Sequence, residues 1–240
     1  MLPVVILCGG LGTRLRPITE DRPKPLVPVG DRPFLAHLLE RLDGEGVSEV
    51  ILSTGHLGEQ IEAFVERTDW SFSVRCVQEE EPLGTGGALR YVAEEGGLEA
   101  FLAMNGDTLF SGSVGRLVEW HDERTRAAAS MALVETDRPD RYGRVRVEVD
   151  TGRITGFEEK QSGGNGPVWI NAGAYVLEPD VWSSIEPERK VSLEREVFPG
   201  WVGQGLYGCR FPDADFLDIG TPDDYRKAEA WLNQHPPSSS

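Results

Sequence analysis

Short apolar runs alternate with longer amphipathic segments in the first half of the chain, and this alternation restricts the fold more than any other feature. Four runs have the length and composition of buried strands: residues 4–7, 49–54, 73–78 and 101–105. Between them, apolar residues recur at helical spacing in residues 35–42, 61–65 and 114–121. This order predicts an α/β fold with a mostly parallel, doubly wound sheet covered by helices on both faces.

The second half is richer in strand patterns. Residues 142–160 alternate around an Asp-Thr-Gly turn and predict a hairpin, and further strands are expected at 169–177 and 216–220. Thr221 and Pro222 predict the start of a final helix. We expect one domain over residues 1–235, with halves of about 1–135 and 136–235, and a disordered tail at 236–240.

The composition excludes several classes of function. The formal net charge of −16 disfavours nucleic acid as a partner, because the surface would repel a phosphate backbone. We find neither an apolar run long enough to cross a bilayer nor a cleavable leader, so no membrane partner and a cytoplasmic location are expected. The three cysteines are far apart and contain no CxxC pair, which argues against zinc sites and disulfides.

A glycine-rich loop with basic residues follows the first apolar run. Arg14, Arg16, Arg22 and Lys24 lie within one short stretch of this acidic chain. The loop is not a dinucleotide-binding GxGxxG, because Leu15 stands where the third glycine would be, and GxxxxGK[ST] is absent. A small polyanionic ligand is therefore expected, held by a loop of another kind.

The longer motif GGLGTRLRPITEDRPKPLVPV resembles the signature of the sugar-1-phosphate nucleotidyltransferases, also called nucleotide-sugar pyrophosphorylases. EEPLGTGGAL, NGD, FEEK, INAG and FLDIGTPDDY follow in the order typical of that family, over essentially the whole chain. The length and the SLEREVFP segment are most similar to D-glycero-D-manno-heptose 1-phosphate guanylyltransferases. The resemblance implies a Rossmann-like, GT-A-like nucleotidyltransferase fold with a β-rich sugar-binding portion in the second half.

The resemblance also implies a reaction between a nucleoside triphosphate and a sugar 1-phosphate. A phosphate oxygen of the sugar attacks the α-phosphorus, and pyrophosphate leaves. The nucleophile is already anionic, so the site must align two polyanions and disperse charge rather than supply a base. Arg14, Lys24 and Asp107 are the expected catalytic residues. The expected nucleotide-binding residues are Leu7, Gly9, Gly10, Gly12, Thr13, Arg14, Lys24, Gln78, Pro82, Gly84, Thr85, Gly106 and Asp107.

Two aspartates are candidate ligands for Mg²⁺, which proteins commonly hold with one or two carboxylates plus substrate phosphates. Asp107 follows a buried strand, and Asp218 interrupts the apolar run FLDIG, where an unpaired carboxylate is costly. By resemblance, the pair would hold the catalytic magnesium. The alternative for Asp218 is a capping or hydrogen-bonding role at the helix that begins at Thr221.

The second half is expected to bind the sugar phosphate. The residues that match family positions are Gly143, Glu159, Lys160, Asn171 and Asp218, with Gly173 as a further candidate. Glu158 precedes Glu159, so the register is open by one residue. Lysine is rare, with four among the 24 Lys and Arg residues, and two of the four, Lys24 and Lys160, stand at motif positions.

Several alternatives stay open from the sequence. Glu79, Glu80 and Glu81 form either a solvated acidic turn, the more ordinary interpretation, or an acceptor for guanine N–H groups. GTP and heptose 1-phosphate are the leading substrates, with adenylyl, thymidylyl or uridylyl transfer, and glucose, mannose or N-acetylated sugars, as alternatives. A non-catalytic nucleotide-sugar-binding subunit is the rival class. The oligomeric state is either monomer or homodimer.

Overall fold

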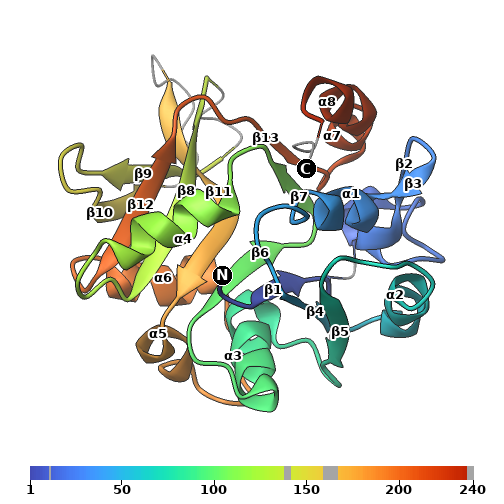
Figure 1. Cartoon of the computed structure of the whole chain (residues 1–240), viewed down its shortest axis with the longest axis horizontal. Helices are drawn as coiled ribbons and strands as arrows, with labels where there is room; N and C mark the ends of the chain where they lie inside the picture. Colours follow the sequence, from blue (N-terminus) through green and yellow to red (C-terminus); the bar gives the residue numbers. More distant parts are fainter. Residues whose placement is uncertain (11, 138–141, 159–166, 237–240) are drawn as a thin grey trace.

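In the computed structural model, which describes residues 1–10, 12–137, 142–158 and 167–236, nine strands form one central sheet (Figure 1). Its first half is parallel, with β1 (Val4–Leu7) between β4 (Glu49–Thr54) and β6 (Phe101–Asn105), and with β5 (Ser73–Gln78) beside β4. These bounds equal the four predicted runs. The parallel half of the fold prediction is confirmed, except that β5 is an edge strand in which no residue is fully buried.

The second half of the sheet is mostly antiparallel. The long strand β11 (Val168–Leu177) pairs antiparallel with both β6 and β8 (Ala129–Thr136), and thereby joins the two halves. β9 (Arg144–Val147) and β10 (Ile154–Glu158) form the predicted hairpin, and β12 (Leu206–Phe211) pairs parallel with β8. The sheet is therefore mixed, with the β-rich portion in the second half as expected.

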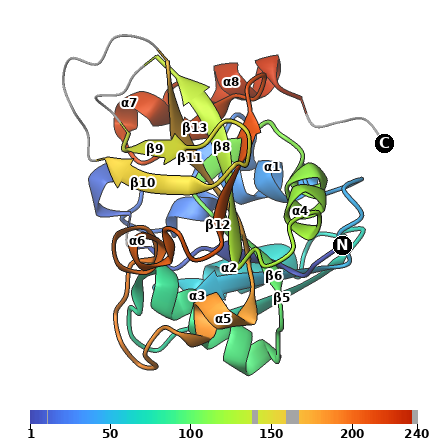
Figure 2. The same cartoon turned by 90° about the vertical axis from the view of Figure 1, so that its left-hand side faces the viewer.

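Helices cover both faces of the sheet (Figures 1 and 2). Alternate strand residues point to opposite faces, so Val4 and Ile6 pack in one hydrophobic cluster and Val5 packs in the other. The first cluster is covered by α1 (Phe34–Glu40), α2 (Gly58–Val65), α4 (Val114–Asp122) and α8 (Ala228–Gln234). The second is covered by α3 (Gly84–Gly96), α5 (Pro179–Ser183) and α6 (Phe198–Trp201).

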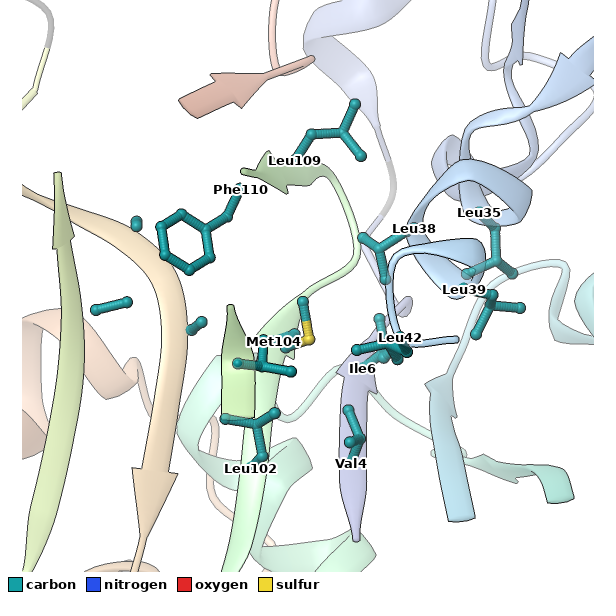
Figure 3. Close-up of a cluster of buried hydrophobic side chains, with 14 of the residues drawn as sticks. Val4, Ile6, Leu35, Leu38, Leu39, Leu42, Leu102, Met104, Leu109 and Phe110 are labelled. Carbon is teal, nitrogen blue, oxygen red and sulfur yellow. The ribbon is translucent and has the colours of Figure 1, made fainter. Parts of the chain in front are cut away.

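The apolar stripe of α1 explains why this segment is helical. Leu35, Leu38 and Leu39 are 1 % exposed or less and face the sheet, where Ile6 and Met104 lie beneath them (Figure 3). Fully burying one such side chain contributes about 1.5–3 kcal/mol. The spacing that predicted the helix is therefore the spacing that the core requires.

Two short ladders lie outside the central sheet and shape the site. β7 (Thr108–Phe110) pairs antiparallel with β13 (Phe216–Asp218), which sets Asp218 opposite Thr108. β2 (Pro28–Val29) pairs with β3 (Arg32–Pro33). In the sequence this ladder follows two 3₁₀ turns, Thr13–Leu15 and Lys24–Leu26. The first of these ladders brings together two motifs that are 111 positions apart in the sequence.

The predicted final helix is two helices, α7 (Pro222–Tyr225) and α8. Its predicted start is confirmed, since the Thr221 hydroxyl accepts from the Asp224 amide and donates to the Asp224 carboxylate. None of the helices in the described ranges is long and apolar enough to cross a membrane. The predicted tail falls almost wholly on residues 237–240, which lie outside the described residues.

Candidate active site

A pocket of about 360 Å³ opens beyond the carboxyl ends of β1 and β6, where doubly wound sheets bind their ligands. Nine of the expected nucleotide-binding residues line it: Leu7, Gly9, Gly10, Lys24, Pro82, Gly84, Thr85, Gly106 and Asp107. Gly12, Thr13, Arg14 and Gln78 do not line it. The fold therefore brings most of the predicted set together around a single cavity.

Glycine is required at two backbone positions, Gly106 in the lining of the pocket and Gly12 outside it. The Gly106 amide donates to the Leu7 carbonyl at 3.0 Å, and a Cβ on Gly106 would lie 2.4 Å from that same oxygen. Gly12 has a φ of +60°, and its carbonyl accepts from the Thr19 hydroxyl at 2.9 Å. The first contact holds the NGD turn against the end of β1, and the second closes the segment from Gly12 to Thr19 on itself.

Charged side chains from three segments lie close together, with Lys24 and Asp107 in the lining of the pocket and Asp218 outside that lining. The Lys24 ammonium lies 2.6 Å from Asp107 Oδ2, and Lys24 is 8 % exposed. Burial raises the pKa of the Asp218 carboxyl, and the nearby Asp107 charge raises it further, whereas Lys24 and Arg14 lower it. The Asp218 carboxyl is thus close enough to Asp107, Lys24 and Arg14 for each of their charges to shift its pKa, although Arg14 itself is exposed.

The two aspartates suit a magnesium ion in their chemistry. No group of three or more His, Cys, Asp or Glu side chains in the described part of the chain could hold a metal by itself. Mg²⁺ does not need such a group, because one or two carboxylates suffice when substrate phosphates and water complete its shell. Asp218 also does not cap α7, since its Oδ1 accepts from the Gly220 amide and Thr221 provides the cap.

The acidic turn after β5 differs from the more ordinary of our two interpretations. Glu80 and Glu81 are exposed, as a solvated turn requires, but Glu79 is 8 % exposed and lines the pocket. Burial raises the pKa of the Glu79 carboxyl, and a hydrogen bond from the Leu83 amide to Oε2 lowers it. Gln78 points elsewhere and donates to the Gly55 carbonyl at 3.4 Å.

A segment from the second half closes the pocket over the N-terminal end of α3. Val191 donates to the Leu83 carbonyl at 2.8 Å and accepts from the Gly86 amide at 2.9 Å. The Thr85 hydroxyl donates to Glu194 at 2.9 Å and accepts from the Leu193 amide at 2.8 Å. We call residues 189–194 the clasp.

The clasp carries Lys190, which lines the pocket and was not among the predicted residues. The rarity of lysine was a usable signal, because Lys190 is one of only four lysines in the chain and lines the pocket together with Lys24. Asn105 was also missed. It lines the pocket at the end of β6, and its Oδ1 is buried without a hydrogen-bond partner among the described residues.

The structure describes only some of the predicted sugar-binding residues. Asn171 lies at an irregularity in β11, where Nδ2 donates to the Tyr175 hydroxyl at 2.8 Å and Oδ1 accepts from the Gly173 amide at 2.8 Å. Gly143 precedes β9 and faces the Glu158 carbonyl. Neither lines the pocket. Glu159 and Lys160 lie outside the described residues.

A family model described as nucleotidyl transferase matches residues 3–235. The chain belongs to this family. The model covers both halves of the sheet, including the glycine loop, the NGD turn and the β13 aspartate. The resemblance that the motifs suggested is therefore confirmed.

Individual relatives of this nucleotidyltransferase are similar in both sequence and structure. It is 38 % identical over 234 residues to a mannose-1-phosphate guanylyltransferase of Mycobacterium tuberculosis, covering 95 % of this chain and 64 % of that protein. It is 35 % identical over 236 residues to a D-glycero-alpha-D-manno-heptose 1-phosphate guanylyltransferase of Aneurinibacillus thermoaerophilus, covering 98 % and 100 %. The crystal structure of HddC from Yersinia pseudotuberculosis complexed with GMP-PN superposes with a TM-score of 0.82 at 33 % identity, covering 97 % and 100 %.

The two guanylyltransferase relatives differ in how much of their own length this chain covers. This nucleotidyltransferase spans less than two thirds of the mannose-1-phosphate relative but the full length of the heptose 1-phosphate relative. What the two share with it is the region that contains the pocket.

Proposed function

We propose that this nucleotidyltransferase transfers GMP from GTP to a sugar 1-phosphate, with D-glycero-D-manno-heptose 1-phosphate as the favoured acceptor. The products are pyrophosphate and a guanosine diphosphate sugar. The observation that carries the proposal is the pocket itself. It places the cations Lys24 and Lys190 around a glycine-lined cavity in a chain of net charge −16, with Asp107 in its lining and Asp218 near enough for the Asp107 charge to affect it.

The chemistry follows from the charges. The acceptor phosphate attacks the α-phosphorus without a general base, so alignment and charge neutralisation carry the catalysis. Lys24 and Arg14 are the proposed phosphate contacts, as charge-assisted hydrogen-bond donors. Asp107 and Asp218 are proposed to hold Mg²⁺, which, when bound, would supply positive charge that offsets the charge developing on the phosphates.

Glu79 supports guanine as the base. Guanine offers the N1–H and N2–H donors along one edge, and an ionised carboxylate is an acceptor without donors of its own. Glu79 Oε2 is already engaged by the Leu83 amide, so Oε1 is the atom available to the base. Adenine and the pyrimidines of UTP and dTTP do not present this pair of donors.

The acceptor assignment rests on the relatives. Two relatives that this chain matches over nearly their whole length are named as heptose 1-phosphate guanylyltransferases, in A. thermoaerophilus and Campylobacter jejuni. Mannose 1-phosphate is the second candidate because of the 38 % identical relative. Lys160 is proposed to contact the sugar phosphate, with Glu159 and Asn171 at sugar hydroxyls. We place the reaction in the cytoplasm.

The test is a pyrophosphate-release panel. GTP, ATP, UTP, CTP and dTTP are each combined with heptose, mannose, glucose and N-acetylhexosamine 1-phosphates, with and without Mg²⁺. We expect the highest kcat/KM for GTP with heptose 1-phosphate, and no release without a divalent cation. Preference for another base would refute the role given to Glu79, and no release from any pair would favour a binding subunit.

A further inference from the structure

The Lys24–Asp107 ion pair occupies the same carboxylate that the proposed function assigns to the metal. Lys24 Nζ lies 2.6 Å from Asp107 Oδ2, an ordinary charge-assisted hydrogen-bond length. The Lys24 side chain is 10 % exposed, whereas that of Asp107 is 36 % exposed and so open to the pocket. The ammonium is therefore held inside the protein wall, against the carboxylate.

Asp218 shares this ammonium electrostatically. It lies on β13, opposite the residue that follows Asp107, and the Ile219 amide donates to the Asp107 carbonyl at 3.0 Å. These contacts bring the Asp218 carboxyl within electrostatic range of both Lys24 and Asp107. One buried cation thus compensates two neighbouring carboxylates in the nucleotide-free protein.

A divalent cation on Asp107 would compete with that ammonium. Mg²⁺ binds carboxylate oxygens at about 2.0–2.1 Å, so an ion on Oδ2 would lie within a few ångströms of Nζ. Two like charges at such a separation in a partly buried site repel strongly. Nucleotide phosphates relieve the conflict, since they offer oxygens to both the ammonium and the metal.

We infer that Lys24 is a stand-in cation: it neutralises the metal carboxylates while the site is empty of nucleotide, and moves to the phosphates when a metal–triphosphate complex enters. The site then binds a divalent ion tightly only when a nucleotide is present, and the nucleotide-free enzyme binds such ions weakly. This inference rests on the proposed function, since it uses the same two aspartates.

The experiment measures Mn²⁺ binding to the nucleotide-free protein, by the loss of the free-ion EPR signal. We expect weak binding to the wild type and binding on the order of tenfold tighter or more to Lys24→Met, because a unit charge near the ion is removed. Lys24→Gln is a second variant that retains a donor to Asp107 without the charge. Lys227→Met is the matched control, since Lys227 pairs with Asp224 on α7 and should leave Mn²⁺ binding unchanged.

The tighter Mn²⁺ binding of Lys24→Met must also depend on the metal carboxylates. Adding Asp107→Asn to Lys24→Met should remove it. Equal Mn²⁺ affinity in the wild type and both Lys24 variants would overturn the inference, as would a gain that survives Asp107→Asn. Pyrophosphate release by the wild type is measured separately. If the wild type releases pyrophosphate but Lys24→Met does not bind Mn²⁺ more tightly, only the stand-in role of Lys24 is refuted. If Lys24→Met binds Mn²⁺ more tightly but the wild type releases no pyrophosphate, the proposed function is refuted.

Discussion

The Thr85 hydroxyl donates a hydrogen bond of 2.9 Å to the Glu194 carboxylate, across 109 positions of sequence. The same oxygen accepts from the Leu193 amide at 2.8 Å. Thr85 therefore joins the start of α3 to η3 (Leu193–Val197). It thereby connects the side of the pocket that we propose binds the base with the second half of the chain.

Replacing Thr85 by valine should destabilise the protein, because the Leu193 amide and the Glu194 carboxylate both lose a partner. We expect a loss of about 1–3 kcal/mol in the free energy of unfolding, measured by urea denaturation. The KM for GTP should rise as well, since the clasp lines the pocket. Thr85→Ser retains the hydroxyl and is the control; equal losses in both variants would show that the hydroxyl is not responsible.

Asp107→Asn should abolish Mg²⁺-dependent pyrophosphate release while the fold is retained. The amide keeps the size of the carboxylate but loses the charge that a hard divalent cation requires. Asp213→Asn, at an exposed position between β12 and β13, is the control and should behave as wild type. Near-normal turnover of Asp107→Asn, at circular dichroism matching the wild type, would remove the metal assignment.

Asp218→Asn should lose activity yet gain stability. Burial and Asp107 raise the folded-state pKa of Asp218, so the folded protein holds this proton more tightly than the unfolded chain does. Stability therefore falls as pH rises from the ordinary aspartate pKa through the raised one, and the deficit persists at neutral pH. Asparagine removes the deficit, and each kcal/mol regained raises Tm by about 2–4 °C.

The pH dependence of Tm tests whether the stability gained by Asp218→Asn comes from removing the buried charge. The Tm difference between Asp218→Asn and wild type should be largest at neutral pH and should vanish below the ordinary aspartate pKa, where both side chains are uncharged. A difference that is constant across this range would contradict the electrostatic origin.

Glu79→Gln should weaken the preference for GTP over ATP. Glutamine can still accept from the Leu83 amide, so the loop is expected to keep its shape, but the charged acceptor is lost. A hydrogen bond to a charged group contributes about 1.5–3 kcal/mol, so the ratio of kcat/KM values should fall roughly tenfold to a hundredfold. Glu80→Gln, the exposed neighbour, should leave the ratio unchanged.

Lys190→Met should raise the KM for the nucleotide or the sugar phosphate by roughly tenfold or more, since a phosphate loses one charge-assisted contact. Steady-state kinetics with each substrate varied in turn will show which one Lys190 contacts. Lys227→Met, which removes the same charge at a position that does not line the pocket, is the control. Unchanged KM values for both substrates would place Lys190 outside the binding site.

Local patterns accounted for much of the parallel half. The strands at 4–7 and 101–105 were predictable to the residue because each is an apolar run that only a covered sheet can bury. The strands at 49–54 and 73–78 were predictable from their β-branched and apolar residues, although 73–78 is a half-buried edge strand. The Thr221 cap was predictable because it satisfies backbone donors three residues away. The glycine loop was predictable as a ligand site, but its ligand came from the family resemblance.

Tertiary structure alone decided which side chains reach the pocket. Gln78 and Glu79 are neighbours, and the alternation of an extended backbone sends one to Gly55 and the other into the cavity. Lys190 enters the pocket only because two backbone hydrogen bonds dock the clasp beside α3. Local periodicity reports which face of an element is buried, whereas these placements depend on which distant segments pair, and that is settled by long-range packing.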